Sequence, residues 1–243
     1  MKKQKSKKQF DQDGYLYFPG FLDKIETNQI KSRLDKIVEE GLQDIPTGHI
    51  KFENTENKQG VKMIQDLHLY DPLFKNILFE SKFSALAAEL LGEKVVGKTV
   101  EFFNKPAKIG KATPPHQDGY YFMLNPISAV TFWISLEEVD KDNGWVSYVK
   151  GSHLNGVRTH RKSGTIGFSQ EIVDFGTPSD LENEEFIATN PGDVLVHHAL
   201  TIHRAAPNTS INRSRKALGL IYFGESAKED LVAKKAYIAS LNK

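Results

Sequence analysis

Two residues near the middle of the chain have the types and the spacing of a metal site. His116 and Asp118 stand in the segment Thr113-Pro-Pro-His-Gln-Asp118. On an extended backbone, residues two apart point to the same side, so the imidazole and the carboxylate can face one centre while Gln117 faces away. Because the chain has eight histidines, such a triplet also arises by chance, and it becomes a metal site only with a further ligand.

His203 is the candidate for that ligand. It follows the apolar segment Asp193–Ile202, which has the composition of a buried strand. Two imidazoles and one carboxylate on one face of an octahedron form the facial triad of non-haem Fe(II) oxygenases, which leaves positions open for a cosubstrate and oxygen. His203 lies far from His116 in the sequence, so the fold must return a distant strand beside the first, as a double-sheeted jelly roll does.

Arg215 opens the next apolar strand, Lys216–Phe223. A guanidinium at the base of a strand that flanks the His203 strand is suited to bidentate capture of a carboxylate. It could anchor a diacid whose other end chelates the metal. The alternative is an ordinary arginine on an edge strand.

Composition and charge exclude several other chemistries. The chain has no cysteine, which rules out thiolate-bound metals, disulfides and cysteine nucleophiles, so nitrogen and oxygen must hold any metal. Lys and Arg number 32 against 31 Asp and Glu, so no global field attracts nucleic acid or an anionic membrane. The apolar stretch Ala129–Leu136 is far shorter than the roughly 18 residues of a membrane span. We expect a cytoplasmic protein with a small-molecule partner and no nucleic-acid or membrane partner; a nucleic-acid demethylase is disfavoured.

The pattern of apolar residues predicts a mainly β domain with flanking helices, a single unit over residues 1–243. We expect the lysine-rich segment 1–13 to be a flexible basic N-terminus, because blocks of like charge usually stay solvated. The segment 155–185 is rich in Gly, Ser, Thr and charge; we expect an active-site lid, with a disordered insertion as the alternative. Helices are predicted over Asp23–Gly41, Ser81–Leu91 and Lys228–Leu241. Strands are predicted over Val95–Asn104, Ser128–Val139, Trp145–Val149, Asp193–His197 and Ala217–Phe223.

Several ordered motifs together resemble the phytanoyl-CoA dioxygenase family, from about Gly14 to Phe223. The resemblance implies a double-stranded β-helix (a cupin-like jelly roll) and an enzyme that uses Fe(II), 2-oxoglutarate and O2, with ascorbate as a stimulant. The motifs are His116-Gln-Asp118, Asp142–His153, Pro191-Gly-Asp193, His203–Ser210 and Arg215-Lys-Ala.

By this resemblance His116, Asp118 and His203 are the iron ligands, and Arg215 pairs with the distal carboxylate of 2-oxoglutarate. Trp133 and Lys62 match positions at the cosubstrate site, with core packing and a solvated surface as their respective alternatives. The chain also departs from the family pattern. Arg204-Ala205 stands where Gly-Ser is frequent, so Thr131 is the candidate for the missing hydroxyl, and Lys150 replaces a proline.

An intact Asp118 favours hydroxylation, because related halogenating enzymes have a small residue there to admit halide. The rival interpretation is a non-catalytic, cupin-like module that binds a metal or ligand. His197 and His198 should point to opposite faces of their strand, so at most one faces the interior; His198 is the candidate for the pocket, with packing as the alternative. The basic segment Arg158–Lys162 and Arg204 favour an anionic substrate. Candidate substrate residues are Phe102, Tyr120, Tyr121, His160, Phe168, Gln170, His198 and Arg204.

Overall fold

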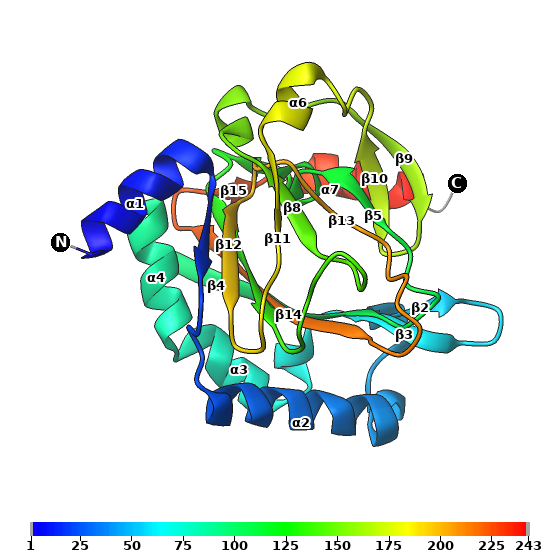
Figure 1. Ribbon diagram of the computed structural model, residues 1–243. Helices are drawn as coiled ribbons and strands as arrows, with labels where there is room; N and C mark the ends of the chain where they lie inside the picture. The colour runs from blue at the N-terminus through cyan, green and yellow to red at the C-terminus, as the bar shows by residue number, and fades with distance from the viewer. Residues whose placement is uncertain (1, 242–243) are drawn as a thin grey trace.

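Side chains alternate along the strands of the larger β-sheet, so one face of the sheet packs against helices and the other lines a cavity. The computed structural model describes residues 2–241, and this sheet has seven antiparallel strands (Figure 1). In β14, Leu218, Leu220 and Tyr222 pack toward the helices, whereas Arg215 and Ile221 line the cavity. In spatial order the strands are β1 (Tyr15–Phe18), β12 (Val194–His198), β7 (Ala129–Ser135), β14 (Arg215–Gly224), β4 (Val95–Lys105), β3 (Gln59–Ile64) and β2 (Ile50–Asn54).

A smaller four-stranded sheet faces the first and completes the predicted double-stranded β-helix. Trp133 and Leu195 from the large sheet pack with Val146, Tyr148 and Ala205 from the small one. The antiparallel order and the two facing sheets confirm the mainly β jelly roll with flanking helices. The strands of the small sheet are β11 (Glu184–Ile187), β8 (Val146–Val149), β13 (His203–Ala205) and β5 (Thr113–His116).

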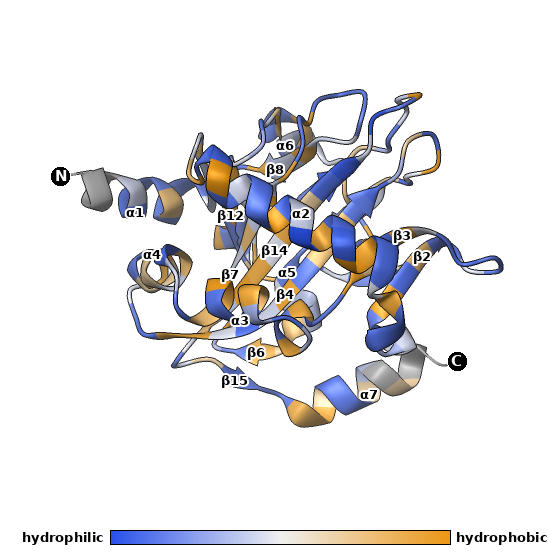
Figure 2. Ribbon diagram, turned by 90° about the horizontal axis from the view of Figure 1, so that it is seen from below, coloured by the Kyte–Doolittle hydropathy of each residue, from blue (hydrophilic) through white to orange (hydrophobic). Residues whose placement is uncertain are grey.

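Helices cover the outer face of the large sheet. Asp23 and Glu26 form a capping box on α2, while Ser81 caps α4 and Gly92 ends it in a left-handed conformation. Hydrophobic and hydrophilic residues alternate along α2 (Figure 2), as expected of a helix with one buried face. No helix within residues 2–241 is both long and apolar enough to cross a membrane. The helices of this layer are α1 (Lys2–Asp13), α2 (Lys24–Glu40), α3 (Pro72–Phe79) and α4 (Lys82–Leu91). Elsewhere lie α5 (Asp118–Phe122), α6 (Pro178–Glu182) and α7 (Leu231–Leu241).

The segment expected to be an active-site lid is folded. It contains the hairpin of β9 (His160–Thr165) and β10 (Phe168–Ile172), followed by α6, and these elements lie together at the top of Figure 1. The hairpin packs beside β5, and the ring centroid of Phe168 lies 5.5 Å from that of His116. The segment therefore covers the site that follows, in place of a disordered insertion. A second small pair joins β6 (Leu124–Asn125) to β15 (Lys228–Glu229).

The expectation of a flexible basic N-terminus over residues 1–13 is wrong for the described part of that segment. Lys2–Asp13 forms α1; Met1 lies outside the described residues. Phe10 is 2% exposed within the main core, and α1 lies against α4. Lys7 pairs with Asp11 one turn along, at 2.5 Å. α1 is therefore docked on the core through Phe10.

Phe10→Ala tests this docking. Truncating a buried phenylalanine should lower the free energy of unfolding by about 3 kcal/mol, since the core loses apolar contact and gains a cavity. Urea denaturation measures the change, with Lys8→Ala as the control, because Lys8 is exposed and surface changes stay within about 0.5 kcal/mol. Equal stability of the two variants would show that α1 does not dock.

Candidate active site

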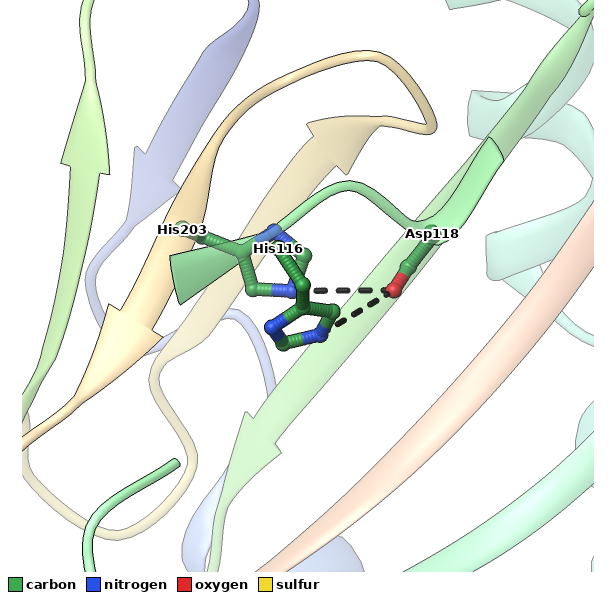
Figure 3. A group of neighbouring side chains, drawn as sticks. All are labelled: His116, Asp118 and His203. Carbon is green, nitrogen blue, oxygen red and sulfur yellow. Dashed lines mark ion pairs between the residues drawn. The ribbon is translucent and has the colours of Figure 1, made fainter. Parts of the chain in front are cut away.

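Pairing of two short strands brings the candidate metal ligands together. β13 pairs with β5 so that His203 lies opposite His116, and Asp118 opens α5 just beyond β5. The Nε2 atoms of His116 and His203 each lie 3.6 Å from Oδ1 of Asp118 (Figure 3). One ligand atom from each residue falls within 4.8 Å of the others. The structure therefore places the three residues predicted as ligands around one point.

Backbone carbonyls fix the two imidazoles in the orientation that a metal requires. Nδ1 of His116 donates to the carbonyl of Pro114 at 2.8 Å, and Nδ1 of His203 donates to that of Thr201 at 3.0 Å. With the proton on Nδ1, the lone pair of each Nε2 faces Asp118 and is free to bind a metal. Burial, with neighbouring histidines, holds the pKa of His203 well below its ordinary value and keeps this ring neutral.

The carboxylate of Asp118 is held by groups that do not belong to the triad. Its Oδ2 accepts a hydrogen bond from the Thr131 hydroxyl at 2.6 Å and lies 3.1 Å from Nε2 of His197. Burial alone would raise the pKa of Asp118, but the imidazoles around it, with the hydrogen bond to His197, outweigh burial and hold this pKa well below its ordinary value. Asp118 is therefore ionised, with Oδ1 directed toward the two ligand imidazoles. Thr131, expected at the cosubstrate, instead orients this carboxylate.

His197, and not His198, is the histidine of β12 that faces the cavity, so the prediction for His198 is wrong. Thr131 is the cross-strand partner of His197, and both residues line the cavity. His198 lies on the other face, with its ring near those of Phe10 and His153. The pairing of β12 with β7 decides between the two histidines, because the residue opposite Thr131 points to the same face of the sheet as Thr131.

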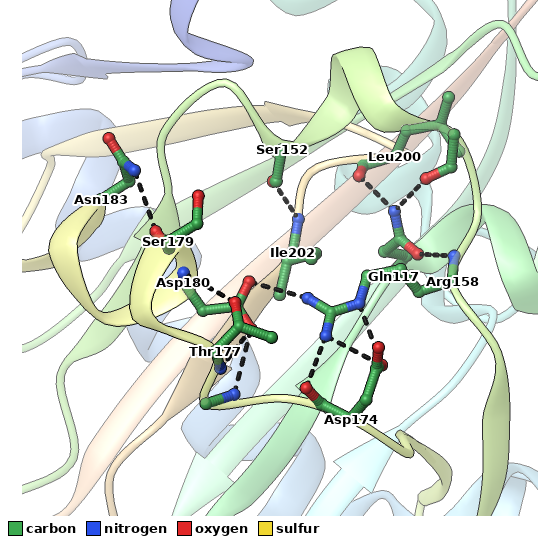
Figure 4. Close-up of polar contacts among 12 residues, drawn as sticks. Gln117, Ser152, Arg158, Asp174, Thr177, Ser179, Asp180, Asn183, Leu200 and Ile202 are labelled. Carbon is green, nitrogen blue, oxygen red and sulfur yellow. Dashed lines mark hydrogen bonds and ion pairs between the residues drawn. The ribbon is translucent and has the colours of Figure 1, made fainter.

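Gln117 points away from the metal ligands, as predicted from the extended backbone. Its side-chain amide donates to the carbonyls of Gly156 and Leu200, at 2.8 and 2.6 Å, and its carbonyl accepts from the backbone of Arg158 (Figure 4). It thereby ties the start of the covering segment to the strand that carries His116. His116 and Asp118 thus face the metal site, while Gln117 between them faces the covering segment.

Three buried cations gather at one end of the cavity. Arg215, Lys62 and Lys105 are 3%, 4% and 3% exposed, and Lys62 contacts the buried Glu53 at 3.3 Å. Burial lowers the pKa of Arg215 to about 10, and burial together with Arg215 and Lys62 lowers that of Lys105. Within the described chain, Nε of Arg215 is buried without a hydrogen-bond partner. Glu53 is a single buried carboxylate beside three basic groups, so this end is short of negative charge, which a bound carboxylate would supply.

Trp133 closes this cationic end, with the Arg215 guanidinium 5.4 Å from its ring centre. The indole also packs between the two sheets, as in the core-packing alternative; its role at the cosubstrate stays a prediction. Lys62 is buried, contrary to the solvated-surface alternative. Lys105 was missed, although it pairs directly with Arg215 across β4 and β14.

The cavity has a volume of about 190 Å³ and joins the metal ligands to the cationic end. Of the predicted substrate residues, Tyr121, Phe168 and Arg204 line it. Phe102 does not: it is 1% exposed and packs in the core beneath the helices, because its neighbours Glu101 and Phe103 take the cavity face.

The remaining predicted substrate residues form the layer behind the cavity wall. Tyr120 stacks on His160 with ring centroids 4.2 Å apart, and Nε2 of His160 accepts from the backbone of Gln117. The backbone of Gln170 exchanges hydrogen bonds with the Tyr121 hydroxyl. These residues support Tyr121 and the metal-bearing strand.

The arginines that favoured an anionic substrate have carboxylate partners of their own. Arg204 makes two contacts to Glu184, at 2.6 and 2.8 Å. Arg158 contacts Asp174 and Asp180 in the covering segment (Figure 4). Their charges are balanced by ion pairs outside the metal centre, so they give little support for an anionic substrate.

Comparison with known proteins gives a consistent result. The phytanoyl-CoA dioxygenase (PhyH) sequence profile matches residues 10–217. A phytanoyl-CoA dioxygenase domain-containing protein 1 homolog of Caenorhabditis briggsae is 27% identical, over 86% of each chain. The 1-deoxypentalenic acid 11-beta-hydroxylase of Streptomyces exfoliatus is 28% identical, over 84% of this chain and 74% of that one. The crystal structure of the epimerase SnoN with Fe3+, alpha ketoglutarate and nogalamycin RO has a TM-score of 0.75 at 21% identity, covering 94% and 86%.

His197→Phe tests whether His197 orients the Asp118 carboxylate. Loss of a group that holds a metal ligand typically weakens metal affinity by 10- to 100-fold, so we expect the dissociation constant for Fe(II) to rise by at least about tenfold. Anaerobic Fe(II) titration measures it. His198→Phe is the matched control on the opposite face, and the hypothesis fails if both substitutions weaken binding equally.

Proposed function

Because the chain belongs to the phytanoyl-CoA dioxygenase family, we propose that it is an Fe(II)- and 2-oxoglutarate-dependent oxygenase. It hydroxylates a small molecule and releases succinate and CO2. The observation that carries this proposal is one cavity with a two-histidine, one-carboxylate centre and a separate cluster of three buried cations. A keto diacid could bind the metal through its keto acid end and the cations through its distal carboxylate.

The residues present fit these cofactors. His116, Asp118 and His203 would hold the iron, as their free Nε2 atoms and ionised carboxylate allow. Arg215, with Lys62 and Lys105 nearby, would bind the distal carboxylate of 2-oxoglutarate. When bound, iron and cosubstrate supply the oxidising chemistry, in which 2-oxoglutarate is decarboxylated to succinate as O2 is consumed.

The protein's own contribution is orientation and exclusion of water. Thr131 and His197 hold one oxygen of Asp118, which keeps the other directed at the centre. Tyr121 and Phe168 place apolar rings against His116, with centroids 5.9 and 5.5 Å from the imidazole. We propose that residues 155–185, which carry Phe168, act as a lid that excludes water during turnover.

Three observations support hydroxylation of a small molecule. Asp118 is a carboxylate and leaves no open position for a halide, and a relative that is 28% identical over 84% of this chain is a 1-deoxypentalenic acid 11-beta-hydroxylase. The cavity of about 190 Å³ is smaller than the roughly 300–1,000 Å³ of typical ligand pockets, which favours a small substrate. A non-catalytic cupin-like module would need no buried Arg215 with an unpartnered Nε.

Anaerobic addition of Fe(II) and 2-oxoglutarate tests the proposal. A weak visible charge-transfer band is expected in the wild type, because a keto acid chelated to Fe(II) absorbs there, and it should disappear in His116→Ala and Asp118→Ala. Visible absorption spectra measure it. Absence of the band in the wild type, or an unchanged band in both variants, contradicts the proposed iron site.

Arg215→Gln tests the distal anchor. Charge-assisted hydrogen bonds contribute about 1.5–3 kcal/mol, so the KM for 2-oxoglutarate should rise by roughly 10- to 100-fold, with a smaller change in kcat. Succinate release without added substrate provides the assay. Arg213→Gln is the control, since Arg213 pairs with Asp140 at 2.9 Å and does not line the cavity; an equal rise in both variants would rule out a specific role for Arg215.

A further inference from the structure

Glu101 and Gln65 line the cavity, and the proposed function assigns no role to either. Glu101 lies on β4 opposite Gly219 of β14, and its side chain lines the cavity together with Gln65, which follows β3. Nε2 of Gln65 donates to Oε1 of Glu101 at 3.4 Å, a long hydrogen bond. A carboxyl group and an amide therefore face the same space as Asp118.

The charges around Glu101 are negative. Burial raises the pKa of Glu101 to about 7; the Gln65 hydrogen bond opposes this rise, and the carboxylates of Asp118 and Asp66 add to it. Asp66 itself accepts from the Thr99 hydroxyl at 2.8 Å and lies 3.3 Å from Nδ1 of His49. Burial is the largest of these effects, so a positive group beside Glu101 would stabilise its buried charge, whereas an anion would add repulsion.

The cations of the same cavity lie near the other end of the strand. Lys105 pairs with Arg215, whereas Glu101 is four residues along β4 and pairs with Gly219. The Phe103 ring covers Gly219, where an added Cβ would lie 2.7 Å from a ring carbon. The 2-oxoglutarate carboxylate would pair with Arg215 and the lysines beside it, so these groups do not neutralise Glu101.

Aromatic side chains line the same cavity as Glu101 and the metal ligands. They are Tyr121, Phe122 and Phe168, of which Tyr121 and Phe168 lie beside the ligand His116, with ring centroids 5.9 and 5.5 Å away. Aromatic faces accept both apolar groups and cations, so this wall is compatible with an alkyl chain that ends in a positive nitrogen.

We propose that Glu101 and Gln65 bind a cationic nitrogen of the substrate, a primary amine or guanidine on a small apolar skeleton. The skeleton lies against Tyr121, Phe122 and Phe168, which places its carbon atoms near the metal centre. This inference rests on the proposed function, and it replaces the anionic substrate that the sequence favoured. Glu101 is a specificity-determining residue in this account.

The test uses three probes that share a six-carbon chain: 1-hexylamine, 1-hexanol and hexanoate. The wild-type protein is loaded anaerobically with Fe(II) and 2-oxoglutarate, so that the cationic end is filled, and each probe is titrated by calorimetry. We expect 1-hexylamine to bind at least about tenfold more tightly than 1-hexanol, with hexanoate the weakest. Equal affinity for all three, or a preference for 1-hexanol or hexanoate, would overturn the inference.

Variants locate the preference. Glu101→Gln should remove the advantage of 1-hexylamine over 1-hexanol, and Glu101→Asp, which keeps the charge, should retain a preference for the amine. Glu56→Gln, an exposed carboxylate at the turn between β2 and β3, is the matched control and should behave as the wild type. An unchanged amine preference in Glu101→Gln would show that another group binds the nitrogen.

The visible band separates the two possible failures. If the loaded wild type shows the band but no preference for the amine, the substrate inference is wrong and the proposed oxygenase stands. If the band is absent, the proposed function itself fails, and the inference that rests on it fails as well.

Discussion

The antiparallel pairing of β13 with β5 is the contact on which the site depends. It sets His203 opposite His116, and no local motif could do so, because the two residues lie far apart in the chain. Each imidazole is then fixed by the backbone carbonyl two residues before it. Backbone geometry therefore determines both the position and the protonation state of the two nitrogen ligands. The third ligand needs only one extended residue, Gln117, between it and His116.

The large sheet supplies the charged residues of the site, because side chains along each strand alternate between the helix face and the cavity face. Its outward side chains form the core beneath the helices, which stabilises the strands. Its inward side chains include Arg215 and Lys105 at one end, Glu101 in the middle and Thr131 and His197 near the metal ligands. Buried cations that lack carboxylate partners are costly in a folded protein. Their retention here is explained if a dicarboxylate completes the site.

Local sequence patterns were sufficient for the main strands, the helices α2 and α4, and the three candidate ligands. They failed where the face of a strand had to be chosen. Phe102 and Phe103 are adjacent aromatic residues, as His197 and His198 are adjacent histidines, so residue type alone cannot say which one faces the cavity. Only the pairing with neighbouring strands decides it. The N-terminal helix was missed for another reason. The run of lysines indicated a solvated segment, and no weight was given to Phe10, which packs in the core.

The central claim is that one ligand spans the metal centre and the cationic end. The most direct measurement is the dissociation constant of 2-oxoglutarate with and without Fe(II), beside that of glutarate, which has the same two carboxylates but no keto oxygen. The account predicts that Fe(II) tightens 2-oxoglutarate binding by at least about tenfold, or 1.4 kcal/mol, and changes glutarate binding much less. Equal affinity for 2-oxoglutarate in the presence and absence of Fe(II) would contradict it.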